Sequence, residues 1–421
     1  MTGTLTLVPL SSVTAWMSGG TPDRSIAEYW VGSIPWISAA SLKGVNVCDS
    51  NQRVTSEAVL AGSKMAPVGA TLILVRGMAL HREVRAGIAM RPVSFNQDVK
   101  ALIPSRSIVP RYLTYSIHAR RSQILSLVTS AGSGTGVLET GALKRLEIWL
   151  PDPTEQATLV EIFDDLEAQV SVLERLIIKT QAIRQGIMQQ LLTGRTRLPG
   201  FAKPRSEVRL GDHVVYIKTV ALSRAQLDSD SPMRYLHYGD IHTSSDVVLR
   251  AAETPMPRAS SALVGSAGRL QVGDVIFADA SEDLAGVGKS VEIISVPNDG
   301  VIPGLHTIAA RFNKGVLADG FKAYLQFIPE FRNALVRLAA GTKVLATTRS
   351  YISSIALELP EVDEQVAITQ ALRDSDDEIR AYRHRLTKAM AIKQGMMQEL
   401  LTGHTRLPVE KGAQHEQRRT D

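Results

Sequence analysis

The sequence predicts an α+β fold in which two globular regions alternate with two long helices. We expect the helices to pack as an antiparallel coiled coil, related by a pseudo-twofold internal repeat. The first observation is a repeated segment: Lys179 to Pro199 returns as Lys388 to Pro408, at an offset of 209, with 15 of 21 positions identical. Apolar residues at heptad spacing precede both copies and predict the helices. Short β-type runs bounded by Gly, Pro, Asn and Asp fill the two remaining regions and predict small sheets.

Each long helix has start and stop signals. Asp152 is suited to cap the first helix, with Pro153 at its first position and Glu155 in its first turn. Gly194 and Gly403 each follow Leu-Leu-Thr and are candidates to end the helices. About 40 residues at 1.5 Å each give a rod of about 60 Å. The heptad stripes consist of Leu159, Phe163, Leu166, Val170, Leu173 and Ile177 in the first helix, and of Ile368, Leu372, Ser375, Ile379, Tyr382 and Leu386 in the second.

The stripe is interrupted at matching places in the two helices. Arg184 and Lys393 occupy one apolar position, and Gly186 and Gly395 follow two residues later. A glycine inside a helix costs about 1 kcal/mol relative to alanine. We therefore expect close backbone approach at the glycines, with inheritance by duplication as the alternative. The basic pair would then leave the seam for solvent or discourage wrong registers.

The boundaries follow from this layout. Strands are expected at 71–75 and 99–103 in the first globular region, and at 274–278, 291–295 and 306–312 in the second. The two regions resemble each other only weakly, as in 68–75 against 272–279, whereas the helices match well. The segments are a first globular region at 1–150, a central helical spacer at 151–199, a second globular region at 200–358, a C-terminal helical spacer at 359–408 and a tail at 409–421 that we expect to be disordered.

Composition excludes several classes of protein. With 421 residues, 44% hydrophobic residues and 21% charged residues, the chain is globular and large enough for several cores. No apolar run approaches a membrane span, and residues 1–20 lack the pattern of a signal peptide, so we expect neither. The single cysteine, Cys48, excludes a disulfide framework and a cysteine-based zinc site within the chain and fits a reducing cytoplasm.

The net charge of +5 is unevenly distributed. Residues 1–150 carry +7, residues 151–199 carry −2, residues 200–358 carry +1 and residues 359–421 carry −1. Arginine side chains suit phosphate oxygens and the guanine edge, so a basic loop after the strand at 71–75 is a candidate DNA contact. The alternative is a solvated basic loop. The candidates there are Arg76, His81, Arg82, Arg85 and Arg91, with Arg120 and Arg121 on a short helix further along.

Glycine-rich turns add weaker candidates. The turn at 132–136 offers backbone N–H groups that could hold a phosphate, and the turn at 341–343 offers the same with a lysine added. A flexible turn before the last strand is the competing interpretation. The near-neutral charge of the second region predicts more reliance on shape and base contacts there. The remaining candidates for DNA contact are Ser133 and Thr135 in the first region and Lys289, His306, Thr342, Lys343 and Arg349 in the second.

Catalytic motifs are lacking in the sequence. It contains no GxxxxGK[ST] for ATP and no [DNS]PP[YFW] run that could hold a flipped adenine. The nine histidines show no metal-binding spacing. Acidic residues at the helix starts are explained by capping and the helix dipole. We therefore expect no catalytic residue, no metal site and no cofactor in this chain.

Several stretches, in order, resemble one known family. The stretch 16–38 (WMSGGTPDRSIAEYWVGSIPWIS), the runs LILVRG and SFNQDVKAL and the segment 132–156 resemble a target-recognition domain that leads into a central helical region. This is the pattern of the specificity (S) subunits of type I restriction-modification systems, and the resemblance covers almost the whole chain. The second half departs from it, because YLHYGDI (235–241) stands where the first half has PWIS, and GGTP is missing.

The resemblance implies a non-catalytic DNA-binding subunit. Each globular region would be a target-recognition domain that reads one half of a bipartite asymmetric site, and the helices would set the spacing. The partners implied are double-stranded DNA, two modification (methyltransferase) subunits and restriction (translocase/nuclease) subunits, which would use S-adenosylmethionine, ATP and Mg²⁺. The alternatives are an orphan DNA methyltransferase and a coiled-coil adaptor that binds protein without DNA.

Overall fold

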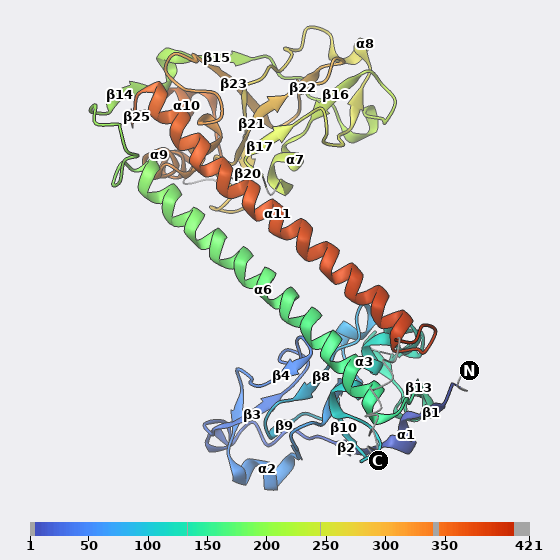
Figure 1. Cartoon of the computed structure of the whole chain (residues 1–421). Helices are drawn as coiled ribbons and strands as arrows, with labels where there is room; N and C mark the ends of the chain where they lie inside the picture. Colours follow the sequence, from blue (N-terminus) through green and yellow to red (C-terminus); the bar gives the residue numbers. More distant parts are fainter. Residues whose placement is uncertain (1–4, 133, 245, 340–344, 408–421) are drawn as a thin grey trace, which may run out of the picture. The chain divides into compact units, whose positions relative to one another are not determined.

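The computed structural model describes residues 5–132, 134–244, 246–339 and 345–407. The chain divides into two compact units (Figure 1). Unit 1 comprises Met1–Arg175 and Arg383–Asp421, and unit 2 comprises Leu176–Tyr382. Each unit therefore contains one globular region together with parts of both long helices. The expected tail and Pro408 lie outside the described residues.

The two long helices are present where the sequence predicts them. α6 (Pro153–Leu192) has 40 residues and α11 (Val362–Leu400) has 39. The Asp152 carboxylate accepts hydrogen bonds from the backbone N–H groups of Thr154 and Glu155, both at 3.0 Å, which confirms the expected cap. Gly194 and Gly403 follow the helices with φ of 72° and 77°, a conformation that favours glycine and confirms them as stop signals.

The expectation of close backbone approach at the interior glycines is wrong. A Cβ atom placed on Gly186 or Gly395 would have no neighbouring atom within 4 Å, so nothing packs against these positions. Inheritance by duplication remains as the explanation. The basic pair is not left to solvent either. Arg184 forms an ion pair with Asp376 in unit 2, and Lys393 forms one with Glu167 in unit 1, because each charge on one helix faces a carboxylate on the other.

The globular part of unit 1 has two main sheets, and its described residues also form the two-stranded sheets β1-β13 and β11-β12. The larger has the order β2-β10-β7-β8-β4, and the smaller has the order β5-β3-β9-β6, with β3 and β9 parallel. The strands of this unit are β1 (Leu7–Pro9), β2 (Thr14–Ser18), β3 (Ile34–Ile37), β4 (Asn46–Val47), β5 (Arg53–Val54), β6 (Met65–Ala66), β7 (Thr71–Leu74), β8 (Ala86–Ala89), β9 (Val93–Phe95), β10 (Val99–Pro104), β11 (Val128–Ser130), β12 (Gly136–Leu138) and β13 (Glu147–Trp149). Its short helices are α1 (Leu10–Val13), α2 (Ser56–Gly62), α3 (Pro110–Ala119), α4 (Arg121–Ser126) and α5 (Thr140–Arg145), with 3₁₀ helices at Ala27–Trp30 and Met78–His81.

Unit 2 repeats this topology. Its larger sheet has the order β15-β23-β19-β21-β17, and its smaller sheet has the order β18-β16-β22, with β16 and β22 parallel. The strands are β14 (Ser206–Arg209), β15 (Val214–Ile217), β16 (Met233–Leu236), β17 (Val248–Arg250), β18 (Arg258–Ala259), β19 (Val275–Ala278), β20 (Ala280–Ser281), β21 (Ser290–Ser295), β22 (Val301–Pro303), β23 (Thr307–Phe312), β24 (Leu345–Ala346) and β25 (Ala356–Leu359). The helices are α7 (Tyr238–Thr243), α8 (Ser261–Val264), α9 (Pro329–Ala339) and α10 (Arg349–Ser354), with 3₁₀ helices at Leu210–His213, Arg224–Gln226 and Lys322–Phe327.

The sheets account for all five of the predicted β runs. β7 and β19 occupy the same place in the two sheet orders, as the weak match of 68–75 with 272–279 suggests. The run at 306–312 starts one residue late, because His306 has a φ of 56° and turns the chain before β23. The preserved topology shows that one frame accommodates two diverged sequences.

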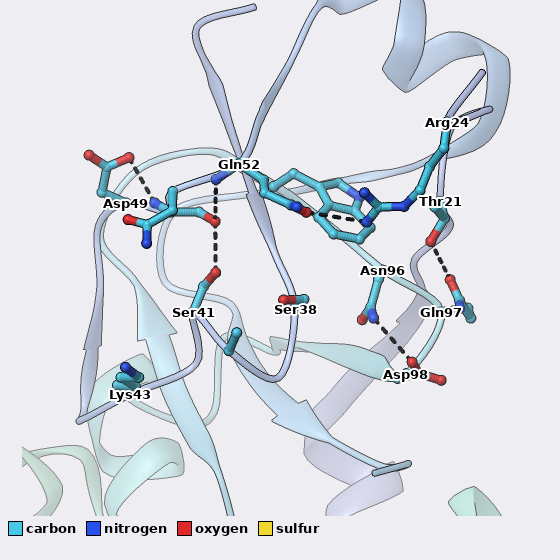
Figure 2. A pocket seen from close by; sticks show the side chains of 14 residues that line it. Thr21, Arg24, Ser38, Ser41, Lys43, Asp49, Gln52, Asn96, Gln97 and Asp98 are labelled. Atoms are coloured by element: carbon cyan, nitrogen blue, oxygen red, sulfur yellow. Dashed lines mark hydrogen bonds between the residues drawn. The ribbon is translucent and has the colours of Figure 1, made fainter. Parts of the chain in front are cut away.

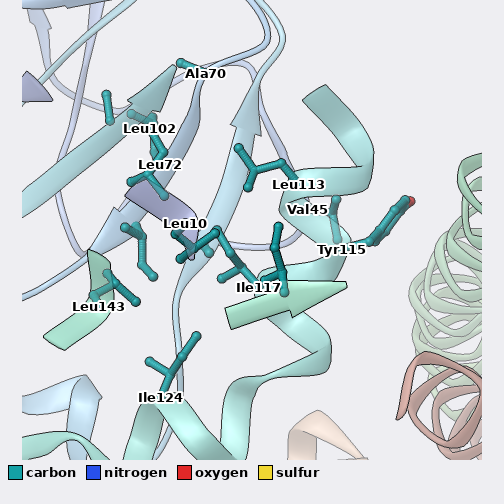
Figure 3. Packing of buried hydrophobic residues seen from close by; sticks show 14 of the residues in the cluster. Leu10, Val45, Ala70, Leu72, Leu102, Leu113, Tyr115, Ile117, Ile124 and Leu143 are labelled. Atoms are coloured by element: carbon teal, nitrogen blue, oxygen red, sulfur yellow. The ribbon is translucent and has the colours of Figure 1, made fainter. Parts of the chain in front are cut away.

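The core of unit 1 lies between the larger sheet and α3. Leu72 and Leu102 from the sheet and Leu113 and Ile117 from α3 are completely buried (Figure 3). Removing this much apolar surface from water supplies the main driving force for folding. Helix residues join the same core: Leu159 and Phe163 of α6, with Met397, Leu400 and Leu401 at the end of α11.

Equivalent helix residues join the core of unit 2. Ile368 and Leu372 of α11 stand 209 positions after Leu159 and Phe163, and they are buried in the second core. At its other end, α6 contributes Met188, Leu191 and Leu192 to that core. The strongly matched segments of the repeat are therefore those that bury their apolar residues in a globular region.

A glutamine at the start of each helix fixes the helix to its globular region. Gln156 accepts a hydrogen bond from the backbone N–H of Val109 at 2.7 Å and donates to the carbonyls of Pro151 and Ser107. Gln365 accepts from the N–H of Ala318 at 2.9 Å and donates to Val316 and Pro360 in the same way. Both glutamines are buried, so each satisfies backbone groups that water cannot reach.

Candidate nucleic-acid interface

Several loops meet at one edge of the larger sheet of unit 1. The N–H of Val75, directly after β7, donates to the carbonyl of Asp98 at 2.8 Å, and the N–H of Leu138 donates to the carbonyl of Val75 at 2.9 Å. The basic loop at 76–85 therefore starts beside the turn at 96–98 and beside the glycine-rich turn at 131–136. We call this set of loops the unit 1 edge.

Two candidates from separate parts of the sequence come together there. The N–H of Gly77 donates to the carbonyl of Gly136 at 3.0 Å, and His81 Nε2 lies 2.9 Å from the carbonyl oxygen of Gly134. A Cβ on Gly136 would lie only 3.0 Å from the Gly77 carbonyl oxygen, so the close approach requires glycine. The carbonyl of Thr135 accepts from the N–H of Ala131 at 2.9 Å, which closes the turn. Ser133 lies outside the described residues.

The arginines of the basic loop differ in what they contact. Arg76 and Arg82 are exposed, and their guanidinium groups are accessible to a ligand. Arg91 is also exposed, but it follows β8 and lies at the opposite end of the larger sheet, because β8 is antiparallel to β7. Arg85 is partly buried: it forms an ion pair with Glu83 at 2.6 Å and donates to the carbonyl of Ala39 at 2.6 Å. Arg85 therefore ties the loop after β3 to the start of β8.

Arg120 and Arg121 lie between α3 and α4, on a helical segment as expected. Arg121 is exposed and its Nη1 lies 3.4 Å from Gln394 Oε1 of α11. Arg120 is partly buried, and its Nε has no hydrogen-bond partner among the described residues. Arg121 thus faces the end of α11 within unit 1.

A polar pocket adjoins the unit 1 edge, at the carboxyl ends of the parallel strands β3 and β9 (Figure 2). Its volume is about 870 Å³. None of the candidates from the sequence lines it. The signal that could have found it is the run of polar residues directly after each of the short segments 34–37 and 93–95, which were not predicted as strands. The pocket is lined by Thr21, Arg24, Trp36, Ser38, Ala40, Ser41, Lys43, Asp49, Ser50, Asn51, Gln52, Asn96, Gln97 and Asp98.

Aromatic rings support one wall of this β3–β9 pocket. The guanidinium of Arg24 lies 4.5 Å from the ring centre of Trp30 and 5.2 Å from that of Trp36, within the range of cation–π attraction. Arg24 also donates to Gln52 Oε1 at 3.3 Å. Hydrogen bonds also join Thr21 to Gln97 and Asn96 to Asp98, on the same side of the view as Arg24 (Figure 2).

In unit 2 the equivalent place is occupied by side chains. Tyr238 follows β16, and its ring centre lies 4.4 Å from that of His237, 5.4 Å from that of His306 and 6.0 Å from that of His242. His306 Nδ1 lies 3.1 Å from an oxygen of Asp279. The run YLHYGDI thus stands where PWIS stands in the first half, because β16 and β3 hold the same place in their sheets.

Burial lowers the pKa of His237 from its ordinary value. Its Nδ1 accepts a hydrogen bond from the N–H of Gly239 at 3.1 Å, while Asp240 accepts from the N–H of His237 at 2.9 Å. This reciprocal cap starts α7 and needs an unprotonated Nδ1. The lowered pKa keeps the ring in that form near neutral pH.

The other candidates of unit 2 have described partners. Lys289 Nζ donates to the carbonyls of His242 at 2.6 Å and Ser244 at 3.1 Å, so it caps the end of α7. Arg349 is exposed, and its guanidinium lies 5.6 Å from the ring centre of Tyr216. Thr342 and Lys343 lie outside the described residues.

The described part of the chain has neither a metal-binding cluster nor a membrane-spanning helix. No group of three or more His, Cys, Asp or Glu side chains in it could hold a metal ion. Neither the long helices nor the shorter ones there combine the length and the apolar character that crossing a bilayer requires.

Comparison with known proteins finds matches in one family. Residues 6–181 match the model of the type I restriction modification DNA specificity domain. The chain is 31% identical over 199 residues to the specificity subunit of the type I restriction enzyme EcoR124I/EcoR124II of Escherichia coli. The matched part covers 47% of this chain and 48% of that one. It is also 31% identical over 172 residues to the MjaIX specificity subunit of Methanocaldococcus jannaschii, covering 38% and 39%.

The chain is thus similar to the specificity subunits of type I restriction-modification systems, and the match to the domain model covers residues 6–181. The predicted resemblance to this family is thus confirmed. The matched part spans 48% and 39% of these two relatives, so less than half of each is aligned.

Solved structures share the fold of this chain. The S subunit from M. genitalium matches with a TM-score of 0.58 at 12% identity, covering 95% of this chain and 97% of that one. A chain from a study of complex assembly and conformational transition of the type I R-M system matches with a TM-score of 0.57 at 15% identity, covering 95% and 98%. These likenesses confirm a mixed α/β fold of the specificity-subunit type.

Proposed function

We propose that the chain recognises a bipartite asymmetric site in double-stranded DNA, with each globular region reading one half. The observation that carries the proposal is the unit 1 edge, where the loop with the exposed Arg76 and Arg82 lies beside the turns at 96–98 and 131–136, which are distant from it in the sequence. Phosphate contacts from such arginines supply affinity, and base contacts supply specificity. The same topology in unit 2 provides the second reader.

The proposed DNA contacts are graded by accessibility. Arg76, His81, Arg82 and Arg91 have exposed side chains on the first reader, and His306 and Arg349 have exposed side chains on the second. Arg85 and Lys289 are engaged with backbone carbonyls, so their contribution is to shape the edges. Arg120 and Arg121, at the start of α4, and the glycine-rich turn with Thr135 complete the proposal for the described residues.

The helices are proposed to act as the spacer between the readers. Glu167 pairs with Lys393 in unit 1, and Arg184 pairs with Asp376 in unit 2. Glu167 and Asp376 stand 209 positions apart, as do Arg184 and Lys393. The carboxylate therefore comes from α6 in one pair and from α11 in the other, and this exchange follows the internal repeat. This exchange supports an antiparallel coiled coil with pseudo-twofold symmetry. The proposed domains are 1–150 and 200–358 for the readers and 151–199 and 359–408 for the spacers.

The partners are also part of the proposal. The spacer helices would dock two modification subunits, which use S-adenosylmethionine, and restriction subunits that use ATP and Mg²⁺ would complete the complex. These cofactors belong to the partners and not to this chain. A cytoplasmic location, which the single cysteine suggests, fits a protein that acts on cellular DNA.

The test is selection of DNA from a pool of random duplexes by the full chain assembled with its modification subunits. The expected result is one site with two specified halves and an unspecified gap, bound more weakly as salt rises. Absence of any salt-dependent DNA binding would contradict the proposal and favour a protein-only adaptor. Binding of S-adenosylmethionine by the isolated chain would favour an orphan methyltransferase.

The spacer role has its own test. Inserting seven residues at matched positions in α6 and α11 adds about 10.5 Å of helix. The expected result is a gap that is longer by about three base pairs, at about 3.4 Å each, with unchanged half-sites. A gap that stays the same length would contradict the spacer role and leave the reader role intact.

A further inference from the structure

The β3–β9 pocket of unit 1 contains a buried acceptor without a partner. Asn96, the first residue after β9, is only 7% exposed. Its Nδ2 donates to Asp98 Oδ2 at 3.1 Å, while its Oδ1 accepts a hydrogen bond from no described residue. A buried carbonyl oxygen without a donor is costly, so such an atom indicates where an incoming donor would be favourable.

The position of this amide is fixed by its surroundings. The N–H of Asn96 donates to the carbonyl of Ile37 at 3.0 Å, at the end of β3, and the N–H of Gly20 donates to the carbonyl of Phe95 at 2.9 Å. A Cβ on Gly19 would lie 2.4 Å from the Asn96 carbonyl oxygen, so the chain after β2 also presses against this turn. The bond to Asp98 sets which end of the amide is nitrogen. The oxygen is therefore held ready as an acceptor before any ligand arrives.

The rim of the pocket suits a nucleic acid. Arg24 and Lys43 are exposed cations on the rim, and Arg24 is held over the rings of Trp30 and Trp36. One carboxylate of the lining, Asp49, is neutralised by its ion pair with Arg53 at 2.7 Å. Cations at the rim fit phosphates, and amide groups below them fit the edges of bases.

We propose that the β3–β9 pocket is a base-reading site in which Asn96 Oδ1 accepts a hydrogen bond from the exocyclic amino group of adenine or cytosine in the DNA major groove. Adenine N6 and cytosine N4 are the major-groove donors, whereas guanine and thymine offer acceptors at the corresponding positions. An acceptor that is already fixed therefore selects the amino-bearing bases. This inference rests on the proposed DNA-reading function and names the chemistry of one of its contacts.

Unit 2 gives an internal control. The equivalent place there is occupied by Tyr238 and three surrounding histidines, so no matching acceptor site is proposed for the second half-site. A change at Asn96 should alter one half-site and leave the other unaffected.

The experiment uses the full chain with its modification subunits and the duplex selected from the random pool. Each adenine of the site is replaced in turn by nebularine, which lacks the N6 amino group, and each cytosine by 2-pyrimidinone, which lacks the N4 amino group. One replacement in one half-site is expected to weaken binding about 5- to 100-fold. Whether that replacement is of adenine or of cytosine identifies the base.

The variant Asn96→Ala links the effect to the pocket. With N96A, the sensitive analogue is expected to cause no further loss, because the acceptor is already absent. Asn96→Ser, a smaller polar substitution, serves if N96A does not fold. Asn46→Ala is the matched control, because Asn46 is an exposed asparagine of unit 1 outside the pocket. It should retain the full sensitivity to the analogue.

Two results would overturn the proposal. The first is that no replacement of an amino-bearing base changes binding by more than twofold, although the complex selects a bipartite sequence. The proposed function would then survive without this inference. The second is an analogue effect that persists unchanged in the folded Asn96 variants. If the wild-type complex selects no DNA at all, the proposed function and this inference fail together.

Discussion

The two units use the same sheet topology but present different surfaces at the equivalent edge. In unit 1 the carboxyl ends of the parallel strands border an open polar pocket of about 870 Å³ next to an exposed basic loop. In unit 2 Tyr238 and its histidine neighbours occupy that place, and Lys289 is engaged in capping α7. The order of the strands in the larger sheet is the same in both units although these surface residues differ. The strand order and the residues at this edge therefore vary independently.

The cores of the two units also differ at one position of the larger sheet, where β7 pairs with β8 in unit 1 and β19 pairs with β21 in unit 2. Thr71 pairs with Ile88 in unit 1, whereas Val275 pairs with Glu292 in the corresponding register of unit 2. Glu292 is fully buried and accepts hydrogen bonds from the N–H groups of Gly320 at 2.6 Å and Ala323 at 2.8 Å. Ile88 of unit 1 is thus replaced by the ionisable Glu292 in unit 2. Of these two residues, only Glu292 is expected to make the stability of its unit depend on pH.

The largest expected effect tests whether the junction between a long helix and its globular region is equivalent in the two units. Gln156→Ala and Gln365→Ala should each destabilise the chain by about 3 kcal/mol, because each leaves a buried backbone N–H and two carbonyls without a partner. Denaturant unfolding would measure the loss, and hydrogen exchange would assign it to unit 1 for Q156A and to unit 2 for Q365A. Gln185→Ala, at an exposed position of α6, is the control and should be nearly neutral. A strongly unequal cost would show that the two junctions are not equivalent.

The next prediction concerns the buried carboxyl of unit 2. Burial raises the pKa of Glu292 to about 7, so the folded state holds a proton that the unfolded state releases above about 4.5. The contribution of this group is therefore present below pH 4.5 and is lost as pH rises through 7. The stability of the wild type relative to Glu292→Gln should fall by up to about 3 kcal/mol between pH 4.5 and pH 8.

Melting temperatures of the two proteins at several pH values would provide the measurement. Glu358→Gln, at an exposed position of β25, should show no comparable change relative to the wild type. A constant difference between the wild type and E292Q across this range would refute the shifted pKa.

The third prediction compares the exposed arginines of unit 1 with Lys289 of unit 2 as contributors to DNA binding. Replacing Arg76 and Arg82 by alanine should weaken DNA binding roughly tenfold and lower the slope of log K against log salt by about 1.8, because each phosphate contact contributes about 0.9. Lys289→Ala should leave the slope unchanged, since its ammonium already binds two carbonyls. Fluorescence anisotropy at several salt concentrations would measure both. Equal slopes for R76A/R82A and the wild type would remove the basic loop from the interface.

The smallest expected effect concerns the helix glycines. Gly186→Ala and Gly395→Ala should each stabilise the chain by about 1 kcal/mol, because a Cβ meets no atom within 4 Å and alanine favours the helix. Gly403→Ala should instead destabilise it, since its φ is 77° and a Cβ would lie 2.3 Å from Leu5. Thermal unfolding would separate the two signs. A loss of stability in G186A would show that a neighbouring atom does pack against this glycine.

Sequence reasoning located elements better than side-chain partners. Heptad spacing, the Asp152 cap and the stop glycines define the helices locally, because a helix is built from contacts between near neighbours. The pocket around Asn96 was missed because its walls come from residues 21–24, 38–52 and 96–98, which only the pairing of β3 with β9 brings together. The glycine turn was suggested as a phosphate site, but its contact with His81 required the folded sheet.

The sequence by itself determined the repeat, the two long helices, five of the strands and the resemblance to one family, since each of these follows from local patterns or matching segments. Tertiary structure alone decided which charges are available. It placed Arg85 against Ala39 and Lys289 against α7, left Arg76 and Arg82 exposed, and buried Asn96 at the base of a polar pocket. The physical reason is that burial and hydrogen bonding depend on residues distant in the chain, which no local pattern encodes.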